Sequence, residues 1–174
     1  MIQEECSTIV SRAIYDSKER QYRYFLSRTW DEKKKIITIL MLNPSKANTL
    51  VSDKTVNNVI RYFEDSEYGS LQIVNLFAYA TSEPNNLKYR EQDKEELNDD
   101  YIARACDNAD LIIVAWTRGE RKPRKREVAK LLEPFQGKIK CFQDATGKKP
   151  RHPRDLKKEE WILTDYSFSE IENE

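Results

Sequence analysis

The chain has 174 residues, of which 39% are hydrophobic and 34% are charged. This length fits one domain, and the compact runs of isoleucine, leucine, valine and phenylalanine exclude an intrinsically disordered chain. The 30 lysine and arginine residues balance the 30 aspartate and glutamate residues, so the net charge is zero. We therefore expect a single domain over residues 1–174, with its core at about residues 22–165.

The sequence shows no sign of a membrane segment, a secretory signal or a metal site. No apolar run approaches the length of a membrane span, and the start, MIQEECSTIV, has neither the basic nor the apolar part of a signal peptide. Three scattered cysteines, Cys6, Cys106 and Cys141, and one histidine are typical of neither a disulfide framework nor a zinc site. We expect a cytoplasmic protein without membrane partner, metal or cofactor, and leave its oligomeric state open.

The predicted elements begin with a β-hairpin over residues 11–30. Alternation around a polar turn there puts Arg23 and Tyr24 on opposite sides of the second strand. Apolar runs then predict strands buried on both faces, as in a parallel sheet, at Ile36–Leu42, Leu71–Phe77, Leu111–Trp116 and Lys138–Phe142. Helices are expected at Thr55–Phe63 (capped by Ser52 or Asp53), Asp93–Cys106, Pro123–Leu132 and Asp155–Glu160, with a last strand at Trp161–Thr164.

Strands that alternate with helices predict a three-layer α/β sandwich with a mainly parallel central sheet, to which the N-terminal β-hairpin is added. The second helix should turn Leu97 and Ile102 toward the core. Right-handed crossovers place every loop that follows a parallel strand at one edge of the sheet, where ligands bind. Four polar loops are expected to meet at this edge, at residues 42–53, 75–86, 116–123 and 143–155.

Asn43, Pro44 and Ser45 end the first core strand abruptly. Pro44 restricts Asn43 to extended backbone geometry and fixes the turn. The Asn43 amide both donates and accepts hydrogen bonds, which makes it a candidate to hold a water molecule or a ligand. The alternative is a purely structural Asx turn, and the tripeptide taken alone favours that alternative.

Asn75 interrupts the apolar second core strand, where a polar amide must find partners or cost stability. Its amide is a candidate to read the edge of a nucleobase, or else it bonds a neighbouring loop. Phe77 points to the same side of the strand and either stacks on a flat ring or, as the commoner role, belongs to the core. Phe77 or Tyr79 is expected to flank the same hollow, because a flat base needs an aromatic face.

His152 is the only histidine and lies in the segment KKPRHPRD. The surrounding cations should favour its neutral form, which can donate to an oxyanion on a base or contact phosphate. A structural role in fixing the loop is an equal alternative.

Positive charge is concentrated between Arg118 and Lys158, where fifteen lysine or arginine residues accompany five acidic ones. Such a surface on a neutral protein predicts a polyanionic ligand, nucleic acid or nucleotide. A solvated helix start with ordinary surface lysines is the alternative. The candidate phosphate contacts are Arg118, Arg121, Arg124, Lys125, Arg126, Lys148, Lys149, Arg151 and Arg154.

Five segments together resemble the family catalogued as domain of unknown function 1643. They are RYFLSRTW, ILMLNPSKAN, the helix start at Asp53–Thr55, IVNLFAYATSEPNNL and KPRHP, and the resemblance covers about residues 22–156. The combination of LNPS and VNLFAY is fairly specific, but the family name implies no activity.

The order of these motifs is also similar, more distantly, to that of the uracil-DNA glycosylase superfamily. Met41–Ser45 resembles its Asn-Pro loop, with Asn43 at the place that positions the attacking water. Asn75 resembles an asparagine near the base pocket, and Arg151–Asp155 resembles the His-Pro-Ser loop, with His152 at the histidine that stabilises the base oxygen. The glycine of the first loop is absent, and Arg154 replaces the serine of the last.

This resemblance implies a uracil-DNA-glycosylase-like fold and a nucleic-acid- or nucleotide-binding protein that removes or recognises a modified base, as a hydrolase of DNA repair does. It implies catalytic roles for Asn43 and His152, and ligand contacts for Pro44, Ser45, Asn75, Phe77 and Tyr79. Two alternatives stay open. One is a binding domain of the same fold without catalysis, which the missing glycine favours. The other is a protein-interaction domain that acts through its acidic stretch Glu91–Asp110.

Overall fold

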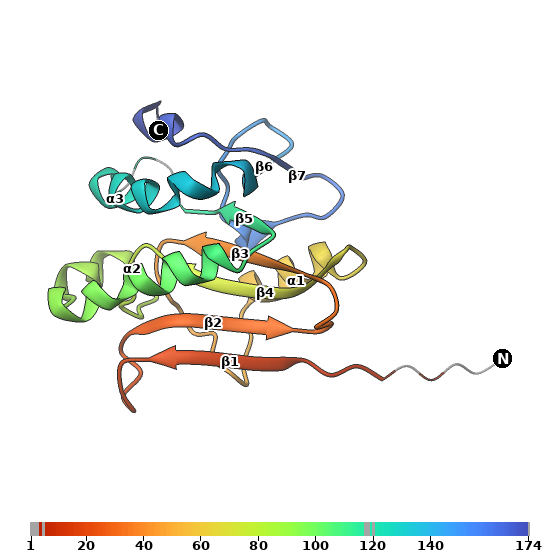
Figure 1. Cartoon of the computed structure of the whole chain (residues 1–174), viewed down its shortest axis with the longest axis horizontal. Coiled ribbons are helices and arrows are strands. Elements are labelled where there is room, and N and C mark those ends of the chain that lie inside the picture. The colour runs from red at the N-terminus through yellow and green to blue at the C-terminus, as the bar shows by residue number, and fades with distance from the viewer. Residues whose placement is uncertain (1–3, 5, 117–118, 120, 174) are drawn as a thin grey trace.

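The computed structural model describes residue 4, residues 6–116, residue 119 and residues 121–173. One sheet runs through this part of the chain. Its strands are β1 (Val10–Tyr15), β2 (Arg23–Thr29), β3 (Lys35–Met41), β4 (Tyr68–Asn75), β5 (Leu111–Val114), β6 (Ile139–Gln143) and β7 (Ile162–Asp165). Their order is β1-β2-β4-β3-β5-β6-β7 (Figure 1). The central strands β4, β3, β5 and β6 are parallel, whereas β1, β2 and β7 pair antiparallel at the two sides.

Helices cover both faces of the sheet. They are α1 (Lys54–Phe63), α2 (Gln92–Asp107) and α3 (Lys122–Leu132), joined by the short 3-10 segments η1 (Pro84–Tyr89), η2 (Glu133–Lys138), η3 (Pro153–Asp155) and η4 (Phe168–Asn173). Val59 of α1 packs with Ile39 on one face, and Ile102 of α2 and Val128 of α3 pack with Leu40 on the other (Figure 1). The chain therefore has the expected three layers, a mainly parallel core and an N-terminal hairpin.

Local signals in the sequence explain where two elements begin. Asp53 caps α1, because its carboxylate accepts a hydrogen bond from the Val56 N–H at 2.9 Å. Pro123 lies in the first turn of α3, where its missing N–H costs nothing. Both starts were expected from the sequence.

Three local expectations are wrong. Residues 155–160 do not form a helix, because the chain makes only the short turn η3 before it enters β7. Leu97 of α2 is 53% exposed, while Glu95 and Asn98 are buried instead. Arg23 lies on the side of Leu26, whereas simple alternation places these two residues on opposite sides, because a register shift in the β1–β2 pairing inserts an extra residue.

None of the described helices combines the length and the apolar character that crossing a bilayer needs.

Candidate functional site

A cleft of about 740 Å³ lies at the carboxyl ends of the parallel strands. Asn43 lines it just after β3, Trp116 just after β5, and His152 in the long loop after β6. The start of α1 and the loop after β4 complete the wall. The structure thus brings Asn43 and His152 to one cleft, although they are far apart in the sequence. Further lining residues are Arg23, Ser45, Lys46, Asp53, Lys54, Thr55, Thr81, Ser82, Lys148, Arg151, Arg154 and Asp155.

The Asn43 amide joins two loops at the rim of the cleft. Its Nδ2 donates to the Thr81 carbonyl at 2.6 Å and to the Pro44 carbonyl at 3.0 Å. The Pro44 carbonyl also accepts from the Thr81 N–H at 3.0 Å. Within the described residues no donor reaches Asn43 Oδ1, so this oxygen is the atom of the amide that can accept a hydrogen bond from a ligand or a water. Ser45 is exposed beside it, while Pro44 is buried.

The imidazole of His152 is held in one tautomer. Its Nδ1 accepts a hydrogen bond from the Arg154 N–H at 3.2 Å, so the proton of the neutral ring lies on Nε2. Burial lowers the pKa of His152 below its ordinary value, and the charge of Arg154 lowers it further. The neutral form was expected from the surrounding cations, but burial is the larger cause. The ring can therefore donate from Nε2 at neutral pH.

Helix α1 fixes the loop that carries His152. The Asn58 Nδ2 donates to the carbonyls of Pro153 at 3.1 Å and Arg154 at 2.7 Å. At the start of the helix, Lys54 pairs with Asp155 at 2.9 Å. These contacts hold the His152 loop against the first turn of α1, so the position of His152 does not depend on the loop alone. Asn58 was not foreseen, since nothing in a helical pattern indicates which loop a polar residue contacts.

Asn75 does not line the cleft. Its Cα pairs with that of Met41 in the parallel β3–β4 register, so its side chain lies on the same side of the sheet as Met41, which does line the cleft. It is 1% exposed, and neither atom of its amide has a hydrogen-bond partner among the described residues. The structure places this amide beneath the floor of the cleft, where it does not reach a ligand directly.

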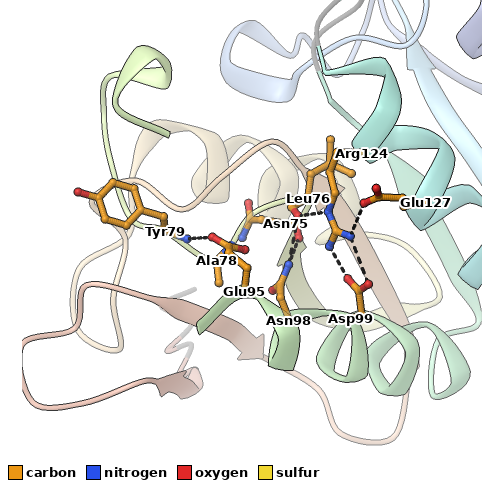
Figure 2. Close-up of polar contacts among 9 residues, drawn as sticks. All are labelled: Asn75, Leu76, Ala78, Tyr79, Glu95, Asn98, Asp99, Arg124 and Glu127. Carbon is orange, nitrogen blue, oxygen red and sulfur yellow. Dashed lines mark hydrogen bonds and ion pairs between the residues drawn. The ribbon is translucent and has the colours of Figure 1, made fainter. Parts of the chain in front are cut away.

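Phe77 and Tyr79 do not flank the Asn43–His152 cleft either. Figure 2 shows the reason: the Glu95 carboxylate of α2 accepts from the backbone N–H groups of Ala78 at 2.8 Å and Tyr79 at 3.1 Å. The chain after β4 is thereby pulled toward α2. Phe77 lies under the Arg90 guanidinium at 4.7 Å, and Tyr79 packs against a tyrosine of the hairpin. Among the described aromatic residues, Trp116 lines the cleft, at the start of the loop expected after the third core strand.

A second cleft, of about 780 Å³, lies between α2 and α3. Phe77, Arg90 and Arg121 line it together with acidic residues of both helices. Burial raises the pKa of the Glu95 carboxyl in its wall, against the lowering effect of its two backbone hydrogen bonds. Positive and negative side chains alternate here, so this cleft has no clear preference for an anion.

Two arginines of α3 pair with acidic side chains, and Figure 2 shows the first of them, Arg124. Arg124 pairs with Asp99 and, at 3.2 Å, with Glu127, and its Nε donates to the Leu76 carbonyl at 2.8 Å. Arg126 pairs with Glu172 at 2.7 Å. Lys125 is fully buried, with its ammonium 5.5 Å from the centre of the Trp116 ring. The prediction that Lys125 contacts a polyanion is therefore wrong, because its side chain is not at the surface. Arg118 lies outside the described residues.

The basic residues after β6 lie differently. Lys148 and Arg154 are exposed and line the cleft. Arg151 lines it too, with an ion pair to Asp144 at 3.2 Å and its guanidinium 5.3 Å from the Trp161 ring centre. Lys149 turns away, because its ammonium binds Glu170 and the Asp165 carbonyl, both at 3.1 Å. The excess of positive charge read from the sequence therefore divides into a paired group on α3 and a group at the cleft.

No metal site or activated thiol accompanies the cleft. In the described part of the chain, no three histidine, cysteine, aspartate or glutamate side chains are grouped to hold an ion. Cys106 and Cys141 are buried, and burial raises the pKa of each thiol to about 12. Cys6 is exposed.

Comparison with known proteins gives a family. No curated protein and no solved structure matches the chain. A family model described as "Protein of unknown function (DUF1643)" matches residues 23–154, a range that contains β2 to β6, all three α-helices and most residues of the cleft. The chain belongs to this family.

Proposed function

We propose that the cleft between Asn43 and His152 binds a nucleotide, either free or as a unit of nucleic acid. The observation that carries the proposal is that a hydrogen-bond acceptor, a hydrogen-bond donor and several cations meet at one sheet edge. Asn43 Oδ1 can accept and His152 Nε2 can donate, while Lys148 and Arg154 are exposed at the same cleft. A nucleotide needs both kinds of contact, because its base presents donors and acceptors and its phosphate is an anion.

The resemblance to the uracil-DNA glycosylase superfamily supports a further step, removal of a modified base. In such a reaction a water attacks C1′ of the sugar, the glycosidic bond breaks, and the base leaves with the bonding electrons. Asn43 Oδ1 would orient the water, and the Nε2–H of His152 would stabilise the negative charge on the leaving base. The water's proton passes to solvent or to the departing base. A duplex or single strand that carries modified bases, followed for base release, tests this step.

One observation favours the second candidate, a domain that binds nucleotides without chemistry. Both N–H bonds of the Asn43 amide already hold the loops at Thr81 and Pro44. An amide is also no base, so the attacking water would have to lose its proton elsewhere. Binding without base release in the same assay would establish this candidate.

Charge reversal at the cleft should weaken binding to nucleic acid. We expect the double variant Lys148→Glu, Arg154→Glu to bind every DNA sequence less tightly, because phosphate contacts carry no sequence information. For duplex DNA, the slope of log affinity against log salt should fall in magnitude by roughly two, about 0.9 for each lost contact. Fluorescence anisotropy over a range of salt concentrations measures both quantities.

The matched control reverses two exposed lysines outside the cleft, Lys33 and Lys130. This variant has the same net charge as the cleft variant. Equal losses in the two variants would show that only net charge matters, and would remove the assignment of phosphate contacts to the cleft.

A further inference from the structure

Arg23 is a buried cation in the wall of the cleft. It lies at the start of β2, where the register shift of the hairpin turns it inward, and it is 4% exposed. Its Nη1 donates to the Ala47 carbonyl. Its Nε has no hydrogen-bond partner, and no carboxylate lies within 4.0 Å of its guanidinium, among the described residues. A buried charge normally has an anion beside it, because removing an unpaired ion from water is costly.

Arg28 on the same strand is a buried arginine with a purely structural role, and it serves as a comparison for Arg23. It is 3% exposed, and its guanidinium donates to the carbonyls of Ser27, Asn48 and Val51. Arg28 does not line the cleft, whereas Arg23 does. Burial lowers the pKa of the Arg23 guanidinium to about 10, with nearby Asp53 acting in the opposite direction. Arg23 therefore stays charged at neutral pH, and its guanidinium makes fewer hydrogen bonds than that of Arg28.

The surroundings of Arg23 favour a negative ligand. The first residues of α1, Lys54, Thr55 and Val56, line the same cleft, and the amino end of a ten-residue helix carries partial positive charge. The Asp53 carboxylate is occupied as the cap of this helix, through its bond with the Val56 N–H. Lys148 and Arg154 line the same cleft. Arg23 is thus the buried member of a set of positive groups that surround one cavity.

We infer that Arg23 is the buried anchor of an anion subsite that takes a phosphate group of the ligand. The inference rests on the proposed function and makes it more specific, since it names the residue that would hold the phosphate group while Asn43 and His152 contact the base. A guanidinium suits this role because its planar donors match two phosphate oxygens at once. A phosphate monoester and free phosphate share the chemistry of the subsite.

Calorimetric titration at low salt tests the subsite with three probes: a deoxynucleoside 5′-monophosphate, the matching nucleoside, and inorganic phosphate. We expect the wild-type protein to prefer the monophosphate over the nucleoside by about tenfold or more, which is the ordinary strength of hydrogen bonds to a charged group. The variant Arg23→Lys should lose most of this preference and keep its affinity for the nucleoside. The control Arg28→Lys should lose stability and keep the preference.

A second measurement does not depend on the folding of a variant. In the wild-type protein, the Nε–H resonance of Arg23 should shift on addition of inorganic phosphate, and that of Arg28 should not. Equal binding of nucleoside and monophosphate, or an unmoved Arg23 resonance, overturns the subsite and leaves the proposed function standing. Phosphate binding that depends on Arg23, without any added affinity from the base, keeps the subsite and removes the proposed function.

Discussion

Replacement of Arg124 by methionine should lower the free energy of unfolding by about 2–3 kcal/mol. The Arg124 side chain is only 15% exposed and ties α3 to α2 through Asp99 and to the end of β4 through the Leu76 carbonyl. Methionine fills similar space but leaves that carbonyl and the partly buried Asp99 carboxylate without their donor. Lost partners of this kind cost more than the bonds themselves contribute. Urea denaturation followed by circular dichroism measures the change.

The matched control is Arg126→Met on the same helix. Arg126 and its partner Glu172 have side chains 50% and 58% exposed, so their ion pair is screened by water. We expect this variant to change the free energy of unfolding by less than about 1 kcal/mol. Equal effects of the two replacements would show that Arg124 is not a structural link between the helices. Charge reversal of residues 124–126 together would therefore disrupt the fold through Arg124, and it would not report on nucleic-acid binding.

On a substrate whose base is released, Asn43→Ala should reduce single-turnover base release by roughly 10²–10³-fold and affinity by less than about threefold. An oriented water matters mainly in the transition state, so losing its acceptor raises the barrier far more than it weakens binding. Rapid-quench kinetics and anisotropy titration measure the two quantities.

The control for Asn43 is Lys130→Ala, an exposed residue outside the cleft. It should leave base release within about threefold of the wild type, as surface changes usually do. Because Asn43 also holds Thr81, the unfolding free energy of Asn43→Ala must be measured beside its kinetics. Parallel losses of affinity and turnover would place Asn43 in ligand binding and remove its role in positioning a water.

Periodicity predicted most of the fold correctly. Apolar runs identified the four parallel strands, and the alternation of strands with helices placed their ends at one edge, where Asn43 and His152 now lie together. Capping chemistry located the start of α1. These features depend on local sequence, because each strand or helix is recorded in the spacing of its own residues.

Features that depend on residues distant in the sequence could not be predicted from it. The bulge at the start of β2 cannot be seen in the alternation of the hairpin, so the sequence placed Arg23 on the side of the strand opposite Leu26. Phe77 belongs to the core, as its commoner role predicted, and neither it nor Tyr79 flanks the Asn43–His152 cleft, because the bonds to Glu95 hold the chain after β4 against α2. Counting the charges of a segment also does not reveal which of them form ion pairs. Arg126, for example, pairs with Glu172 near the other end of the chain.

Nucleotide binding between Asn43 and His152 is tested most directly at the imidazole of His152. Since the chain has one histidine, its ring signals in an NMR spectrum need no assignment by mutation. We expect a neutral ring protonated at Nε2, with a pKa below 6.5 in the free protein. Addition of a nucleotide should shift these signals saturably, with the dissociation constant found by calorimetry. Ring signals that stay unchanged while the protein becomes saturated with nucleotide would contradict the claim.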